Sequence, residues 1–389
     1  MDLFGEPEAP EEEDIVEEIV GDVPEAASGL MHPRLMNASF GHEAQEAKIL
    51  EQFEAGRMPH GLIFTGPKGI GKATFAYRVA RFLLSQQAKE PNQDALFGGD
   101  DLPRESASLN IEPESQTFRQ VASGGHPDLM TGERAYDAGK DRHKDAVAVD
   151  DIRKVIPFLR MTASKEGGWR VVIIDDADTM NRNAQNAILK VLEEPPDNTV
   201  LILICHRLGA MIPTIRSRTQ LLQFKTVNEA HFRELLLMQG YDLEQDQFDT
   251  LYHLSDGSVG AALEYIEQGG LDTLTLILTM FENWPKYSWP DIHVLADQLG
   301  NANAKSAYNS FTILLPWMFN QMITAKARGR EIASKVLHID PLQKLYRQSS
   351  LESLLEICEN LKTHFDTVER SNLDKRQSVL SAFMIMENA

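Results

Sequence analysis

Residues Gly61 to Leu84 join an apolar stretch to a glycine-rich turn that contains a lysine, a combination suited to binding phosphate. The sequence there reads GLIFTGPKGIGKATFAYRVARFLL. Gly66, Gly69 and Gly71 would let the backbone curve closely around phosphate oxygens, and the helix that follows would offer free N–H groups. Lys72 would supply a positive charge for the β- and γ-phosphates. The segment therefore predicts a phosphate-binding loop.

The position after the lysine departs from the usual pattern. A phosphate-binding loop normally has Ser or Thr there to hold Mg²⁺, whereas this chain has Ala73 followed by Thr74. One step along a helix turns a side chain by about 100°, so Thr74 replaces the missing hydroxyl only if the loop shifts. We expect a pocket that can hold ATP or ADP, with weak support for Mg²⁺.

Two acids follow a second apolar stretch, in GGWRVVIIDDAD. Such a run is typical of a buried parallel strand that carries acids to the carboxyl edge of a sheet, where ligands bind. In proteins with a phosphate-binding loop, an acid at the end of such a strand approaches the metal ion bound with the nucleotide, and Asp175 occupies that position. Asp176 stands where many ATPases have a water-activating Glu, but its side chain is one methylene shorter. The alternative, an acid that only caps the next helix, fits Asp178 better.

Two further pairs of polar residues lie beside later apolar runs. Cys205 is the last residue of the run TVLILIC and His206 follows it, at a position where a polar side chain would face the γ-phosphate. Ser217 and Arg218 lie in IRSRT, just before the last strand of this region. An ordinary surface arginine is the alternative interpretation of Arg218.

The elements that position these residues alternate between strand and helix. Apolar runs at 62–65, 171–174, 199–205 and 221–224 are separated by segments with one apolar helical face. This alternation predicts an α/β fold, a parallel sheet covered by helices on both faces. From Asn228 onward the pattern is helical throughout.

The domain organisation follows from composition and pattern. Residues 1–31 contain eleven acids and no Lys or Arg, which predicts a disordered acidic tail. Residues 32–226 form the predicted nucleotide-binding domain, with a polar insertion at 85–145. Residues 227–270 form a small three-helix domain, and residues 271–389 form an all-helical domain.

Composition limits the function classes. The net charge of −20 argues against a chain that binds nucleic acid through a basic surface without the help of partner proteins. Two cysteines far apart predict neither a disulfide framework nor a zinc site, and we expect no structural metal. No apolar run approaches the ~18 residues of a membrane helix, and no secretion signal is evident, so we expect a cytoplasmic protein.

Taken together, GPKGIGKAT, VVIIDDADTMNRNAQNAILKVLEEPP, IRSRT and LSDGSVGAALEY resemble the clamp-loader branch of the AAA+ ATPases. The resemblance implies an AAA+ domain, a helical lid domain at 227–270 and a collar domain at 271–389. It also implies that Ser217 and Arg218 match the family's Ser-Arg-Cys motif, although Thr219 replaces the cysteine. In that family the arginine reaches the γ-phosphate on the neighbouring subunit. Gly260 stands where active motors carry a sensing arginine.

Two functions compete at this point. The first is a weak or inactive ATPase that assembles with gamma or tau and delta subunits, the sliding clamp and primed DNA, and lends Arg218 in trans. Such a subunit would be part of a DNA-directed DNA polymerase holoenzyme, a nucleotidyltransferase. Ala73, Asp176 and Gly260 favour it, because each weakens a different part of hydrolysis. The second is an active motor that opens the clamp itself. A small-molecule kinase is more distant, because the last third is helical and no substrate-binding arginine lid is evident.

Overall fold

The computed structural model describes residues 31–86, 108–134, 136–137, 142–143 and 146–387. The predicted acidic tail lies outside these residues except for its last position. The described chain forms two compact units. The first contains the residues up to Pro67 and from Gly71 to Lys225, and the second contains Lys68–Ile70 and the residues from Thr226 onward.

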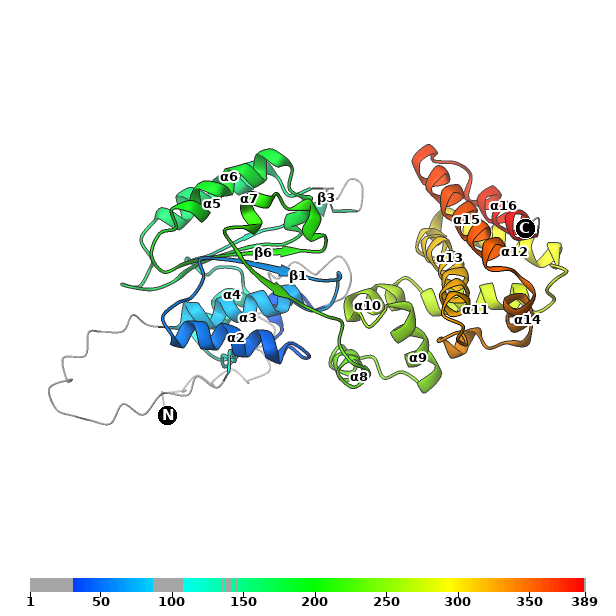
Figure 1. Cartoon of the computed structure of the whole chain (residues 1–389), viewed down its shortest axis with the longest axis horizontal. Helices are drawn as coiled ribbons and strands as arrows, with labels where there is room; N and C mark the ends of the chain where they lie inside the picture. Colours follow the sequence, from blue (N-terminus) through cyan, green and yellow to red (C-terminus); the bar gives the residue numbers. More distant parts are fainter. Residues whose placement is uncertain (1–30, 87–107, 135, 138–141, 144–145, 388–389) are drawn as a thin grey trace, which may run out of the picture. The chain divides into compact units, whose positions relative to one another are not determined.

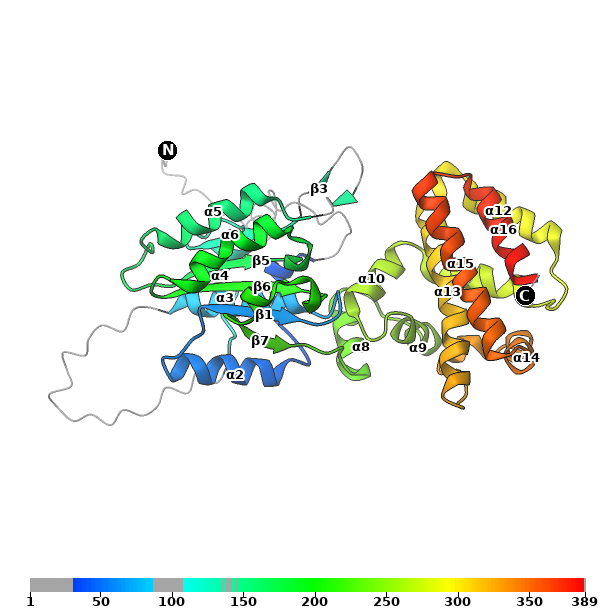
Figure 2. The same cartoon turned by 45° about the horizontal axis from the view of Figure 1, so that its top comes forward.

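A five-stranded parallel sheet forms the centre of the first unit. Its strand order is β2-β5-β6-β1-β7, so that the strand before the phosphate loop lies between two later strands (Figure 2). The strands are β1 Gly61–Thr65, β2 Leu129–Gly132, β5 Arg170–Ile174, β6 Thr199–Cys205 and β7 Gln220–Gln223. Every residue of β1, β5 and β6 is buried, as expected for parallel strands covered on both faces.

Helices cover both faces of this sheet, with α5 and α6 on one side and α2 and α3 on the other (Figure 1). Their bounds are α2 Glu43–Glu54, α3 Lys72–Ser85, α5 Val149–Arg160, α6 Arg182–Glu193 and the short α7 Pro213–Arg216. Apolar residues of α5 and α6, including Ile152 and Ile188, join the core against the sheet. The predicted α/β fold class is confirmed.

The segment expected to be a polar insertion contributes an edge strand. Within 85–145 the structure has α4 Gln116–Ala122, strand β2, and a two-stranded antiparallel pair, β3 Tyr136–Asp137 with β4 Arg142–His143. Strand β2 is absent from the predicted strands because it is short and mostly half-exposed, with only Gly132 buried, so no apolar run marks it.

Short 3-10 turns complete this unit. They are η1 Pro33–Leu35, η2 Ala177–Thr179 and η3 Leu208–Ala210. The buried side chain of Arg81 fixes the first of these turns to α3, since its guanidinium donates to the carbonyls of Arg34 and Met36 at 2.9 and 2.6 Å. The same guanidinium lies over the Phe118 ring of α4.

The second unit is helical in all its described elements. Its α-helices are α8 Glu229–Met238, α9 Gln245–Leu254, α10 Val259–Glu267, α11 Gly270–Phe281, α12 Trp289–Gly300, α13 Lys305–Ala327, α14 Asp340–Gln348, α15 Leu351–Ser371 and α16 Lys375–Glu387. The 3-10 turns are η4 Ala302–Ala304 and η5 Lys335–Leu337. The division of this unit at residue 270 stays a prediction. Among the described helices, none has the length and hydropathy needed to cross a membrane.

Candidate functional site

The loop between β1 and α3 has the backbone geometry of a phosphate cradle. Gly69 and Gly71 have φ angles of 74° and 91°, a left-handed conformation that residues with a Cβ rarely adopt. Gly71 is also the N-cap of α3, and no side chain caps this helix. The first N–H groups of α3 are therefore available to an anion, and the positive end of the helix dipole favours one.

Lys72 turns back over this loop. Its Nζ donates to the carbonyl oxygen of Gly66 at 2.8 Å and to that of Pro67, and it lies 2.9 Å from Nδ1 of His206. Burial lowers the pKa of Lys72 to about 8, although nearby acids, Asp175 first among them, oppose the shift. The ammonium therefore remains charged at neutral pH, with its donors directed to groups of its own chain.

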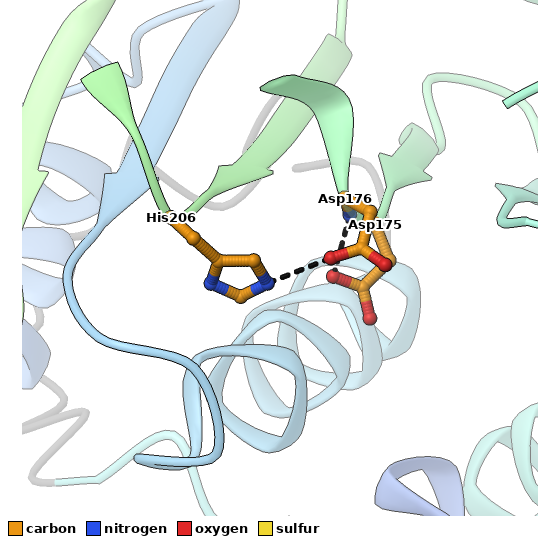
Figure 3. Close-up of side chains that lie close together, drawn as sticks. All are labelled: Asp175, Asp176 and His206. Carbon is orange, nitrogen blue, oxygen red and sulfur yellow. Dashed lines mark hydrogen bonds and ion pairs between the residues drawn. The ribbon is translucent and has the colours of Figure 1, made fainter. Parts of the chain in front are cut away.

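His206, which contacts this lysine, also forms a hydrogen bond with Asp176 of the acidic pair, as Figure 3 shows for His206 and the two acids. Because an ammonium can only donate, Nδ1 of His206 must accept from Lys72, and the ring proton is on Nε2. That Nε2–H donates to Oδ1 of Asp176 at 2.7 Å. The other carboxylate oxygen of Asp176 accepts from Nε of Arg134 at 2.5 Å. A continuous chain of hydrogen bonds thus runs from Lys72 through His206 and Asp176 to Arg134.

The two acids differ in their electrostatics although they are adjacent. Burial, and then the charge of Asp176, raises the pKa of Asp175, which accepts the backbone N–H of Asp176 at 2.8 Å. Burial alone would raise the pKa of Asp176 as well, but His206 and Arg134 outweigh it and lower the value to about 2. Asp176 has φ 48° and ψ 37°, so a left-handed turn at the end of β5 separates the two side chains.

The same residues fit phosphate better than Mg²⁺. Ala73 has no side-chain oxygen, and the hydroxyl of Thr74 is directed to the sulfur of Met36 at 3.9 Å. Ala73 instead lines a cavity of about 90 Å³ together with Tyr77, Glu133 and Asp175. A bound nucleotide would bring its phosphates to the loop and to Lys72, whereas Mg²⁺ would lack the hydroxyl ligand that usually holds it.

Asp175, Asp176 and His206 also bring ligand-type atoms within 4.8 Å of one another. Both ring nitrogens of His206 and both carboxylate oxygens of Asp176 already have protein partners. The cations Lys72 and Arg134 thus supply the charge that a metal ion would bring. We assign no metal to this cluster.

Gly260 lies against the tip of the phosphate loop, within the second unit. Its N–H donates to the carbonyl oxygen of Gly69 at 2.8 Å, and Ser258 Oγ donates to the carbonyl of Lys68 at 2.8 Å. A Cβ at position 260 would lie 2.7 Å from the Cα of Gly69. This conformation therefore leaves no room for a side chain at position 260.

Arg218 follows α7 and has a separate set of partners. Its Nη1 donates to the Thr214 carbonyl at 3.1 Å and to Ser217 Oγ at 3.4 Å, and its Nη2 pairs with Oε1 of Glu193 at 3.0 Å. The Arg218 side chain is 37% exposed. In the described part of the chain, none of its polar contacts involves the phosphate loop or the acidic pair.

The sequence analysis did not single out Arg134 and Glu193, which are important partners at these two sites. Arg134 comes just after β2, at the carboxyl edge of the sheet where Asp175 and Asp176 also lie, but that strand was not recognised. Glu193 is the first acid of LEEPP, which ends one of the motifs that carry the family resemblance but had no role assigned to its acids. Asp178, the helix-cap alternative, instead accepts the backbone N–H of His206 at 3.0 Å.

The sheet, the glycine loop with its lysine and the acids at the strand ends define an α/β protein of the phosphate-loop class. Residues 100–228 match the family described as DNA polymerase III, delta subunit. The curated relatives include DNA polymerase III subunit delta' of Pseudomonas aeruginosa, 31% identical over 54% of this chain and 56% of that protein. The same subunit of Escherichia coli K12 is 29% identical over 56% and 57%. The predicted resemblance to clamp-loader proteins is confirmed, and the similarity is to the delta' subunit of DNA polymerase III.

More distant relatives include the replication factor C small subunit of Natronomonas pharaonis, 24% identical over 60% of this chain and 59% of that protein. The chain thus spans less than two thirds of the length of these relatives. Among solved structures, a gamma subunit-related protein of Thermotoga maritima covers 87% of this chain and 99% of its own, with 14% identity and a TM-score of 0.37. The RuvB Holliday junction motor of the same organism covers 81% and 91%, with 12% identity and a TM-score of 0.37.

Proposed function

We propose that this protein is a non-motor, delta-prime-like subunit of a bacterial clamp loader. In this proposal it joins gamma or tau and delta subunits in a hetero-oligomeric ring in the cytoplasm, and the ring loads a sliding clamp on primed DNA. Its own task is to present Arg218 to the ATP held by the neighbouring motor subunit. The similarity to delta-prime sequences supports the assembly, and the geometry supports the division of labour.

One observation carries the arginine role. The Arg218 guanidinium is partly exposed beyond the end of α7, and its polar contacts are with Thr214, Ser217 and Glu193 rather than with its own phosphate loop. Ser217 supports the arginine as a hydrogen-bond acceptor. An exposed guanidinium that does not serve its own nucleotide site is free to stabilise charge on the γ-phosphate of a neighbour.

The state of the chain's own pocket supports the same proposal. Gly66, Gly69, Gly71 and Lys72 suit ATP or ADP phosphates, but Thr74 faces Met36 and cannot take the place of a hydroxyl at position 73. Asp176 is bonded to His206 and Arg134 and is therefore not available to activate water. Asp175 has a raised pKa, which weakens it as a metal ligand. We infer that the chain binds nucleotide, if at all, without efficient hydrolysis.

The test is the turnover of ATP in a reconstituted ring. Arg218→Ala is expected to lower turnover by the neighbouring motor by ~10³-fold, the effect of losing a complete arginine finger. Arg216→Ala, two residues earlier at an exposed position, serves as the control and is expected to leave turnover unchanged. Complex formation is followed by gel filtration, so that a loss of assembly is separated from a loss of catalysis. Unchanged turnover in an intact Arg218→Ala ring would exclude a role for Arg218 in ATP hydrolysis by the neighbouring subunit.

A further inference from the structure

Glu193 is the charged partner of Arg218 within the same chain. The ion pair between Glu193 Oε1 and Arg218 Nη2 is 3.0 Å long, and the two side chains are 50% and 37% exposed. It joins the last residue of α6 to the residue two positions after α7. Nothing in the local structure of α6 favours an acid there, because the negative end of the helix dipole disfavours a carboxylate at a C-terminus. Among the residues that the structure describes, the ion pair with Arg218 is the polar contact of the Glu193 side chain.

The two ends of the guanidinium have different partners. Nη1 is held by oxygens of its own helix end, the Thr214 carbonyl and Ser217 Oγ, while Nη2 faces the carboxylate of Glu193. A carboxylate and a phosphate oxygen bind a guanidinium in the same way, through charge-assisted hydrogen bonds. The position that Glu193 occupies on Arg218 is thus one that an external phosphate oxygen could take.

We propose that Glu193 is a positioning residue for Arg218, and that the γ-phosphate of the neighbouring subunit's ATP displaces it when the ring assembles. In the free subunit Glu193 neutralises the guanidinium and keeps it folded on its own surface. In the assembled ring the triphosphate takes over the Nη2 donors, while Thr214 and Ser217 continue to hold Nη1. This inference rests on the proposed function of Arg218.

The strength of the pair suits such an exchange. Exposed ion pairs contribute about 0.2–1 kcal/mol, which at 1.4 kcal/mol per tenfold corresponds to about 1.4- to 5-fold in an equilibrium. An ion pair of this strength orients the Arg218 guanidinium in the free subunit, and a triphosphate can displace Glu193 from it in the ring. Removing the Glu193 charge should therefore raise the motor's kcat/KM for ATP by about 1.4- to 5-fold, because the competitor is lost.

The matched experiment compares Glu193→Gln with Glu194→Gln. Glu194 is the next residue, is exposed, and makes no ion pair among the described residues, so both variants remove one negative charge from the same place. Steady-state turnover of Mg²⁺-ATP by reconstituted rings gives kcat and KM for each variant. We expect kcat/KM to rise for Glu193→Gln and to stay at the wild-type value for Glu194→Gln. The difference should shrink at high salt, because screening weakens the pair.

A double-mutant cycle separates this inference from the proposed function. In an Arg218→Ala background, Glu193→Gln is expected to have no further effect, since its influence passes through the arginine. If Arg218→Ala lowers turnover but the two Gln variants behave alike, or Glu193→Gln lowers kcat/KM, the exchange is wrong and the arginine role stands. If Arg218→Ala changes nothing, the proposed function itself fails.

The contact can also be tested without any turnover. In the free subunit with ¹⁵N-labelled arginine, the NMR signal of the Arg218 guanidinium should move in Glu193→Gln and stay in place in Glu194→Gln. An unmoved signal in both variants would show that the ion pair is absent in solution, and the inference would fall whatever the turnover results.

Discussion

Asp176 is connected by hydrogen bonds to the charged and polar side chains of the pocket. Its two carboxylate oxygens accept from His206 and Arg134, and His206 in turn accepts from Lys72. In a working ATPase the lysine would bind phosphate and the acid would activate water. Here each of these groups has a partner within the chain. These side chains therefore form a hydrogen-bond network that is satisfied within the chain and stabilises the fold.

This network should make Asp176 important for stability. The pKa of Asp176 is about 2, below its ordinary 3.8, so the folded state favours the charged form. The corresponding stabilisation is fully present above pH 4 and is lost as the pH falls through 2. At 1.36 kcal/mol per pKa unit, Asp176→Asn is expected to lower the free energy of unfolding at pH 7 by about 2 kcal/mol. Urea denaturation monitored by circular dichroism measures this loss.

The pH dependence and a surface control make the prediction specific. At pH 3 roughly half of the difference between wild type and Asp176→Asn should remain, because the unfolded carboxyl is then mostly protonated and the folded one is not. Asp151→Asn removes an exposed i,i+3 pair with Lys154 and should cost less than about 0.5 kcal/mol. Equal losses in the two variants, or a loss for Asp176→Asn that does not change with pH, would contradict the network.

At the scale of elements, the start of α10 packs against the tip of the phosphate loop through a close contact between two glycines. Gly260 and Gly69 approach so closely that a Cβ on the first would meet the Cα of the second at 2.7 Å. Ser258, the N-cap of α10, accepts from the N–H of Ala261 and donates to the Lys68 carbonyl. The N–H of Gly260 and the hydroxyl of Ser258 thus hold the loop tip through its backbone carbonyls.

Gly260→Ala tests this packing. The added methyl group would clash with backbone, which cannot move aside as a flexible side chain does, so we expect a loss of about 1–3 kcal/mol in the free energy of unfolding. The amide of Gly260, which donates to Gly69 at 2.8 Å, should exchange with solvent faster in the variant. Gly209→Ala is the control, because its Cβ would meet nothing within 4 Å. Similar stability and exchange in the two variants would rule out the close contact.

The elements show where sequence pattern is informative and where it is not. Strands such as β6 are fully buried and apolar along their length, so their positions follow from the sequence. The edge strand β2 is half-exposed and gives no such signal. The candidate site divides in the same way. Local motifs predicted Lys72, Asp175 and Arg218, while Arg134 and Glu193 gain their roles from contacts between segments distant in sequence, which no local pattern records.

At the scale of the whole molecule, the proposed function attributes weak hydrolysis to three different positions. In that proposal Ala73 lacks the hydroxyl of a metal ligand, the partners of Asp176 compete with a water-activating role, and Gly260 lacks the charge of a sensing arginine. Restoring the usual residue at one of these positions should therefore restore only the function of that residue, such as metal binding, and not ATP hydrolysis. This result would distinguish a chain with weak ATPase activity from an active motor that uses unusual residues.

Ala73→Thr is the informative variant, because position 73 lines the cavity beside Asp175 and a hydroxyl there would reach the place of the missing metal ligand. We expect Mg²⁺ to raise the affinity for ADP by about tenfold in this variant, while Ala73→Val, which has the same shape without the hydroxyl, shows no such gain. Calorimetric titration with Mg²⁺ or with EDTA measures both. Single-turnover hydrolysis of ATP by the isolated chain should stay at background in all three proteins, since Asp176 and Gly260 are unchanged. Rapid hydrolysis by the wild-type chain alone would instead establish it as an active motor, and Arg218 would then not be its main contribution.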